Sequence, residues 1–378
     1  MIVPNYYYVI VGGGLAGLQL ALRLKEDIFF KGKKIAIIDP SNKSENDKTW
    51  CFWEKGNGNW DKIVSRKWSK ASFISENTKQ DLDLAPYNYK MLRSIDFYNY
   101  ALKELKQSSE IFFIADEISR IDPVTRAAIG KKDQYTATHF FDSRPPENLN
   151  KKKKTNLIYQ HFKGWTIETS EDSFNSEAFT MMDYRLPHEN STSFHYVLLI
   201  SSTRALVEFT FFTPFISEEN IYDPYLEKYI SEILNIQDYK ILDTEYGVIP
   251  MTDYPFQKDN SKYITKIGTA GGWVKASSGY SFKNTEKKTT QIIENIKKGF
   301  PPTHELYERK FQFYDRIFLD VLSKRNEIGP QLFEKFYTKN AIQDIFKFLD
   351  EETGLREDLK IMASLYHPQF LKSFFNKL

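Results

Sequence analysis

A cluster of glycines near the N-terminus carries the clearest chemical signature in the sequence. Gly12-Gly13-Gly14-Leu15-Ala16-Gly17 follows an apolar run, and a second apolar run over 34–39 ends in Asp39. In a unit of strand, turn, helix and strand, the first glycine permits a tight turn, the second lets a pyrophosphate approach the backbone, and the third allows close helix packing. The terminal carboxylate accepts the ribose hydroxyls. We therefore predict that an adenine dinucleotide binds Gly12, Gly14, Leu15, Ala16, Gly17 and Asp39, with a turn used only for packing as the alternative.

A second glycine-rich turn lies far along the chain, within residues 263–282. It follows a short apolar run and precedes a helical pattern over 285–297. Two such turns suit one extended cofactor held at both ends, as FAD requires, whereas NAD-only enzymes usually need only the first turn. The cofactor contacts expected in the second turn are Gly268, Gly271, Gly272, Lys275 and Gly279.

Composition excludes several classes of function. A net charge of +2 over 378 residues gives no reason to expect nucleic acid, and the short run Lys151–Lys154 is typical of a solvated loop. The single cysteine, Cys51, excludes an internal disulfide framework, and six histidines without ligand spacing predict no metal site. No apolar run approaches the roughly 20 residues that span a bilayer. We expect a cytoplasmic protein in which Cys51 is a small packed residue.

The order of the predicted elements indicates an α/β protein with an inserted sheet. Strand and helix patterns alternate through a helix over 94–107 and a strand over 110–114, whereas 157–215 shows the period of two that is typical of antiparallel strands. Amphipathic helices follow residue 301. We predict an FAD-binding Rossmann-like domain made of 1–150 and 256–300, a β-rich substrate domain over 151–255 and a helical C-terminal cap over 301–378. The segment Asp47–Trp53 and the Gly- and Asn-rich stretch that follows it are expected to form a loop near the dinucleotide.

Glu208 is the acidic residue with the clearest catalytic potential. It lies in the second strand of a predicted hairpin, 194–200 and 205–213, among apolar neighbours. Burial there would raise the pKa of the carboxyl, so that it stays protonated at neutral pH and holds a proton for transfer. A carboxylate on the exposed face of an antiparallel strand is the alternative.

Several further motifs occur in an order that resembles the lycopene cyclase family. They are Thr49-Trp-Cys-Phe-Trp53, Asp142-Ser-Arg-Pro145, Gln160-His-Phe-Lys-Gly164, Met182-Asp-Tyr-Arg185, Glu208-Phe-Thr210, Gly247-Val-Ile-Pro-Met251 and the stretch 271–282. The resemblance covers residue 6 to about 282 and is to the bacterial lycopene β-cyclase flavoproteins, which are related to the plant β- and ε-cyclases. The C-terminal helices carry no matching motif.

The resemblance implies a reaction in which the linear ψ-ends of lycopene, or of a related linear carotene, close into β-rings without net redox change. Reduced FAD would be the cofactor and NAD(P)H its reductant. The essential acid of the family maps to Glu208, and Phe209 stands where relatives often have a second acid. Matching motif positions add Thr49, Trp50 and Asp142 to the expected cofactor contacts, with a turn cap as an equal alternative for Asp142.

The expected substrate pocket includes two further acids and two aromatic residues, Asp183, Glu245, Phe209 and Phe211. For Asp183, a simple ion pair with Arg185 is an equal alternative. Glu245 is either a second acid or base, or a charge at a surface strand end.

The main alternative function is that of an FAD-dependent isoprenoid or carotenoid oxidoreductase or monooxygenase using NAD(P)H. Many such enzymes have Gly-Asp where this chain has Gly268-Thr269, which favours the cyclase. A carrier of carotenoid or flavin is a second alternative. Because lycopene is insoluble, we expect peripheral attachment to the cytoplasmic membrane through apolar contacts, since residues 301–378 contain twelve acidic and twelve basic residues.

Overall fold

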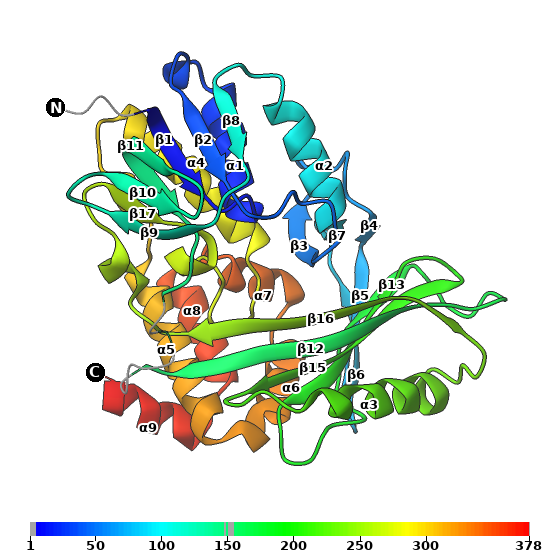
Figure 1. Cartoon of the computed structure of the whole chain (residues 1–378). Coiled ribbons are helices and arrows are strands. Elements are labelled where there is room, and N and C mark those ends of the chain that lie inside the picture. The colour runs from blue at the N-terminus through cyan, green and yellow to red at the C-terminus, as the bar shows by residue number, and fades with distance from the viewer. Residues whose placement is uncertain (1–4, 147–148, 150–154, 378) are drawn as a thin grey trace.

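The molecule combines a parallel sheet, a long antiparallel sheet and a helical C-terminal region (Figure 1). The computed structural model describes residues 5–146, 149 and 155–377, so the run Lys151–Lys154 lies outside the described residues. The three parts confirm the predicted fold class.

The first sheet contains the N-terminal glycine turn. Its parallel core has the order β8-β2-β1-β11, β17 pairs with β11, and β10 and β9 extend the sheet in antiparallel fashion. The strands are β1 (Tyr6–Val11), β2 (Ile35–Ile38), β8 (Ile111–Ile114), β9 (Ile118–Asp122), β10 (Ala127–Gly130), β11 (Gln134–Asp142) and β17 (Ile264–Lys266). Helix α1 (Leu15–Glu26) packs between α2 (Ser94–Leu105) and α4 (Phe282–Lys297). The carboxyl ends of β1, β2, β11 and β17 therefore meet at one edge, where α1 begins.

The second sheet has the order β16-β12-β15-β14-β13-β5-β6. Its strands are β5 (Lys70–Ile74), β6 (Lys79–Asp83), β12 (Leu157–Glu168), β13 (Ala178–Asp183), β14 (Ser193–Leu199), β15 (Arg204–Thr213) and β16 (Lys240–Thr252). The predicted β14–β15 hairpin is confirmed. Helix α3 (Tyr222–Lys228) contacts β12 and β15, and α5 (Arg309–Lys324) contacts β12, β15 and β16. The apolar residues of β15 divide between two separate cores accordingly.

Two expectations for the first hundred residues were wrong. Thr49–Trp53 is not a loop, because β3 (Thr49–Lys55) pairs with β7 (Tyr87–Arg93), which also pairs with β4 (Arg66–Trp68). Aromatic residues and threonine favour strands, and the glycines that suggested a loop follow this strand instead. Residues 70–83 were assigned to the cofactor domain, yet β5 and β6 belong to the second sheet because β5 pairs in parallel with β13.

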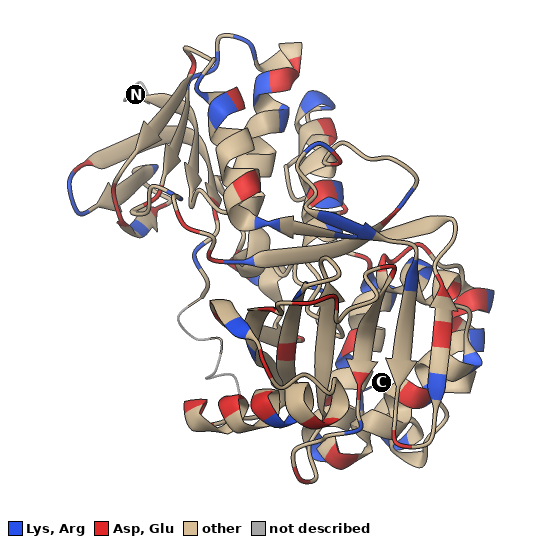
Figure 2. Cartoon of the chain, turned by 90° about the vertical axis from the view of Figure 1, so that its right-hand side faces the viewer, with Lys and Arg blue, Asp and Glu red and all other residues tan. Residues whose placement is uncertain are grey.

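The C-terminal region consists of helices that cover the second sheet opposite α3. After α5 come α6 (Gly329–Lys339), α7 (Ile342–Leu349), α8 (Leu355–Ser364) and α9 (Pro368–Lys377). In the described part of the chain, no helix has the length and hydropathy needed to cross a bilayer. Figure 2 shows Lys and Arg interspersed with Asp and Glu over the helices and strands that face the viewer, in keeping with the small net charge.

Candidate functional site

The first glycine turn is shaped by close backbone contacts. Gly12 has a φ of +104°, and a Cβ there would lie 1.9 Å from Ser143 Oγ. A Cβ at Gly17 would lie 2.0 Å from the carbonyl oxygen of Gly12, whereas one at Gly14 would meet nothing within 4 Å. The backbone N–H of Gly13 donates to Asp39 Oδ2 over 2.7 Å. The turn is thus tightly packed at Gly12 and Gly17 and open at Gly14.

All six residues expected to bind a dinucleotide in the first turn line one large pocket. They are Gly12, Gly14, Leu15, Ala16, Gly17 and Asp39. The open face at Gly14, the start of α1 and the nearby carboxylate of Asp39 fit the pyrophosphate and ribose of an adenine dinucleotide.

The second glycine turn contributes only some of its expected residues to the pocket. Gly268 and Gly279, with φ of +59° and +77°, line it. Gly271 and Gly272 serve packing instead: a Cβ would lie 2.5 Å from the carbonyl oxygen of Lys266 at the first and 2.5 Å from the ring of Phe256 at the second. Neither lines the pocket.

Lys275 also lies outside this pocket. Its ammonium is 2.9 Å from both Asp315 Oδ2 and Glu351 Oε1, and the residue is 3% exposed. The geometry makes Lys275 a link between the second turn and the C-terminal helices.

The remaining expected cofactor contacts divide between the pocket and its surroundings. Thr49 and Trp50 line the pocket from β3. Asp142 does not, and Ser143 takes that place. Burial alone would raise the pKa of Asp142, but Arg144 and Lys266, at 2.8 Å each, hold it below its ordinary value. Asp142 therefore has the geometry of a structural ion pair.

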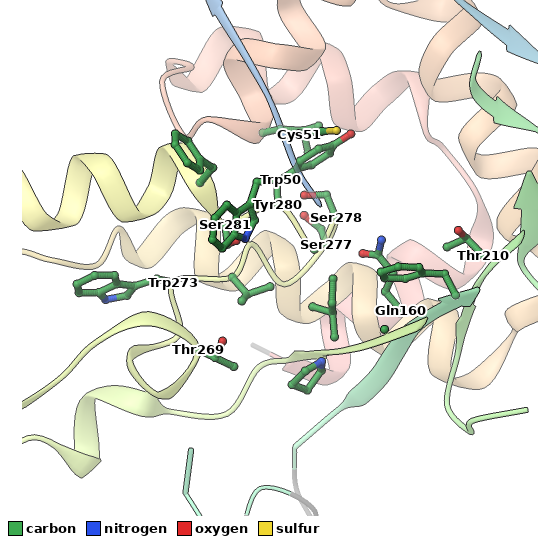
Figure 3. Close-up of a pocket in the computed structure, with 18 of the residues that line it drawn as sticks. Trp50, Cys51, Gln160, Thr210, Thr269, Trp273, Ser277, Ser278, Tyr280 and Ser281 are labelled. Carbon is green, nitrogen blue, oxygen red and sulfur yellow. The ribbon is translucent and has the colours of Figure 1, made fainter. Parts of the chain in front are cut away.

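The pocket has a volume of about 830 Å³ and extends from the glycine turns to the C-terminal helices. Figure 3 shows side chains from β3 (Trp50, Cys51), the second turn (Ser278, Tyr280) and the inserted sheet (Gln160, Thr210) around it. Its far wall is apolar and aromatic, formed by Tyr314, Phe318, Leu332, Phe333, Phe336, Tyr337, Phe348, Leu349, Met362, Leu365 and Phe370. Sequence reasoning missed this wall, because helical apolar spacing is the same for core and pocket residues.

Glu208 and Glu245 meet in the pocket across a glycine. Gly164 of β12 lies directly opposite Glu208 of β15 and also opposite Glu245 of β16. A Cβ at Gly164 would lie 2.8 Å from Cγ of Glu208 and 3.2 Å from Cγ of Glu245. The missing side chain therefore gives two carboxyls room on one face of the sheet.

The environment of Glu208 favours its protonated form. It is 8% exposed. Burial raises its pKa well above the ordinary value, and the Glu245 carboxylate raises it further. Burial also raises the pKa of Glu245, which accepts a hydrogen bond from Thr49 Oγ1 over 2.9 Å. The alternative of an exposed Glu208 is excluded.

Phe209 and Phe211 do not line the pocket, contrary to expectation. They point to the opposite face of β15, where Phe209 stacks on Tyr225 with 4.6 Å between ring centroids. Successive side chains of a strand point to opposite faces, so placing Glu208 in the pocket also places Thr210 and Phe212 there. The alternation along β15 is therefore the sequence signal that would have predicted Thr210 and Phe212, rather than Phe209 and Phe211, as pocket residues.

Asp183 is also outside the pocket. Its carboxylate binds the Arg185 guanidinium and accepts a hydrogen bond from Tyr229 over 2.8 Å, and the residue is fully buried. The ion-pair alternative is thus the one that the structure shows, while the adjacent Met181 and Met182 line the pocket.

A chain of tyrosines adjoins Glu208. Tyr89 Oη lies 2.8 Å from the hydroxyls of both Tyr196 and Tyr280, and Tyr196 is directly opposite Glu208 on β14. Burial raises the pKa of nearby Cys51 to about 12, so its thiol is neutral. Polar groups and aromatic faces thus surround Glu208. Within the described residues, no three His, Cys, Asp or Glu side chains form a group that could hold a metal ion.

Solved structures place this architecture in the structural class that includes flavin-dependent enzymes. A geranylgeranyl bacteriochlorophyll reductase-like protein from Thermoplasma acidophilum has a TM-score of 0.62 at 11% identity, covering 99% of each chain. The flavin-dependent brominase Bmp2 has a TM-score of 0.64 at 11% identity, covering 99% of this chain and 100% of its own. PqsL, a probable FAD-dependent monooxygenase from Pseudomonas aeruginosa, has a TM-score of 0.56 at 9% identity, covering 92% of this chain and 99% of its own. At these identities the likeness establishes the fold.

The particular family is shown by the sequence. The family model described as "Lycopene cyclase protein" matches residues 8–374, nearly the whole chain. The chain belongs to the lycopene cyclase family, which confirms the resemblance in its motifs and extends it over the C-terminal helices. No curated protein sequence matches the chain.

Proposed function

We propose that the protein is a lycopene β-cyclase, converting linear ψ-ends of lycopene into the β-rings of γ-carotene and β-carotene by a proton-initiated, redox-neutral cyclisation. The observation that carries this proposal is the buried Glu208 carboxyl, which faces a large, mainly apolar pocket beside a second carboxyl. An oxygenation does not need such an acid, and a hydride reduction, which also uses a proton, would add hydrogen to the product.

The pocket residues supply two parts of this chemistry. Glu208 holds a proton on its carboxyl oxygen until it is transferred to the terminal double bond, which leaves a carbocation that the neighbouring double bond attacks. Aromatic faces in the wall, such as Tyr337, Phe333 and Phe336, stabilise the cation by about 1 to 2 kcal/mol each when close to it. The apolar lining also excludes water, which would otherwise trap the cation.

Both glycine turns fit FAD in the same pocket. Gly12, Gly14 and Gly17 would hold the pyrophosphate, Asp39 the ribose, and Gly268 and Gly279 the far end of the cofactor. When bound, reduced FAD would supply negative charge near the developing cation in a low-dielectric site. NAD(P)H is the proposed reductant and would not be consumed with each ring formed.

Membrane attachment is proposed through α8 and α9. Leu355, Leu359 and Met362 lie at i, i+4 and i+7 on α8; the first two are 67% and 62% exposed, and Met362 lines the pocket. On α9, Phe370 lines the pocket and Phe375 is 71% exposed. The continuity of exposed apolar side chains with the pocket wall suits the uptake of an insoluble carotene from a bilayer.

Expression of the chain in a lycopene-accumulating bacterium tests the activity directly, with accumulation of γ-carotene and β-carotene as the expected result. Anaerobic incubation of lycopene with the protein and pre-reduced FAD should give a product of unchanged mass. A gain of hydrogen or oxygen would instead identify the oxidoreductase or monooxygenase. Glu208→Gln should abolish ring formation and leave bound FAD unchanged, whereas a carrier would lose nothing.

A further inference from the structure

A second cavity, of about 820 Å³, has Glu245 of the carboxyl pair in its wall. It is lined by residues of β7, α2, β12, β15 and β16. Lys62, Lys103 and Asp243 at its wall are exposed, and the side chains of Arg93 and Arg204 are each 52% exposed. The cavity therefore has charged, solvent-exposed groups at its wall, although most of its lining is apolar.

Glu245 and Thr49 are the residues that line both spaces. Glu208 lines the main pocket alone. Because Glu208 and Glu245 flank the same glycine and their side chains meet there, the Glu245 carboxyl stands between Glu208 and the second cavity. Thr49 Oγ1 holds Glu245 Oε2 in this position.

A buried proton donor needs a route by which its proton is exchanged. A carotene filling the main pocket would cover Glu208 on that side, since the wall around it is apolar. The second cavity, which Glu245 also lines, offers a route to solvent. A carboxyl can pass protons between water and a second carboxyl.

We propose, on the basis of the cyclase function above, that Glu245 relays protons between solvent in the second cavity and Glu208. In each turnover the O–H bond of Glu208 breaks as a C–H bond forms on the less substituted carbon of the terminal double bond. The C–H bond that later breaks in the ring returns its proton to the ionised carboxyl pair. Glu245 then exchanges that proton with water, so that one solvent proton enters the product, one substrate proton leaves, and no electron is transferred. Glu245 therefore acts through Glu208: it supplies protons to the Glu208 carboxyl and removes them from it, without touching the substrate.

Glu245 and Glu208 are surrounded by polar and charged groups from several strands. Glu245 faces Thr49 of β3, Glu208 of β15 and, on its own strand, Asp243. On the pocket side Glu208 lies near Cys51 and Tyr196, and the charged groups around the second cavity, besides Asp243 and Glu245, are Lys62, Arg93, Asp96, Lys103 and Arg204. Glu245→Gln keeps the shape of the side chain while removing its capacity to carry a proton, and Thr49→Val removes the hydroxyl that orients it.

Deuterium labelling in D2O tests the relay during turnover. The wild-type protein should place one solvent deuterium in each new ring. Glu245→Gln should recycle substrate hydrogen over many turnovers, with a loss of deuterium from the product and a turnover at least about tenfold slower, since loss of a proton-transfer group commonly costs about 100-fold or more. Glu232→Gln, an exposed glutamate outside both cavities, is the control. Wild-type labelling and rate in Glu245→Gln would overturn the proposal.

An infrared measurement tests the relay without turnover. The C=O band of the protonated carboxyl, identified by its disappearance in Glu208→Gln, should shift after transfer of the FAD-loaded protein into D2O. This exchange should be slower in Glu245→Gln and in Thr49→Val than in the wild type. Equal exchange rates in the wild type and the two variants would contradict the relay, even if the protein forms no rings. If exchange is slower in the variants but the wild type has no cyclase activity, only the proposed function is rejected.

Discussion

Lys275 Nζ lies 2.9 Å from Asp315 Oδ2 and thereby joins the second glycine turn to α5. Glu351, which follows α7, approaches the same ammonium at 2.9 Å. Burial alone would lower the pKa of Lys275, but the two carboxylates raise it above its ordinary value. One buried cation thus connects the end of the pocket that would hold the cofactor to the helices that form its apolar wall.

Lys275→Met should destabilise the protein by about 3 to 5 kcal/mol, because it leaves two poorly hydrated carboxylates without a partner. The measurement is the urea midpoint of the FAD-loaded protein. Lys287→Met is the matched control: Lys287 pairs with Glu352 at 2.7 Å, but the two side chains are 39% and 46% exposed, so the expected cost is about 1 kcal/mol or less. Equal effects of the two substitutions would contradict the structural role of Lys275.

The sequence predicted the structure best where a feature depends on residues that are close together along the chain. The turn around Gly12 is determined by a few successive positions, and its place at the start of α1 follows from local pattern. The meeting of Glu208 with Glu245 depends on the register of three strands around Gly164, which no local pattern specifies. Phe209 and Phe211 were misplaced although strand alternation settles their side, because their apolar character suits either face of a sheet that is covered on both.

Gly17→Ala should remove bound FAD from the purified protein. The new Cβ would lie 2.0 Å from the Gly12 carbonyl oxygen and would force α1 away from β1. Gly13→Ala is the matched control, since its Cβ would lie 3.5 Å or more from all atoms around it, an ordinary contact. Flavin absorbance per protein should fall sharply in the first variant alone. Full flavin content in Gly17→Ala would show that the turn does not hold the cofactor.

Gly164→Ala should disrupt the carboxyl pair without affecting the glycine turns. Its Cβ would press on Glu208 Cγ at 2.8 Å and on Glu245 Cγ at 3.2 Å, so both side chains must move. We expect ring formation to fall by about 100-fold, the usual scale for a misplaced general acid, with flavin content unchanged. Carotenoid analysis and flavin absorbance measure the two effects, and undiminished cyclisation would show that the geometry of the pair is unimportant.

Glu208 should make the stability of the protein depend on pH. Its pKa is raised on folding, so the unfolded chain ionises from about pH 4.3 while the folded carboxyl stays protonated. The stabilising contribution is present below that pH and is lost as pH rises toward the folded pKa. Glu208→Gln, which resembles the protonated acid, should match the wild type near pH 4 and exceed its stability near pH 8. Unfolding curves at both pH values measure the difference, and a constant offset would exclude a raised pKa.

Exposed apolar residues on α8 and α9 should bind the protein to lipid bilayers. The double substitution Leu359→Ser and Phe375→Ser removes two side chains that are 62% and 71% exposed, so it should weaken co-sedimentation with phospholipid vesicles while flavin content stays constant. Val124→Ser is the control, because Val124 is 88% exposed but lies between β9 and β10 of the first sheet. With net charge near zero, raising the salt concentration should change vesicle binding little. Binding that survives the double substitution, or that falls equally in Val124→Ser, would place the membrane contact elsewhere.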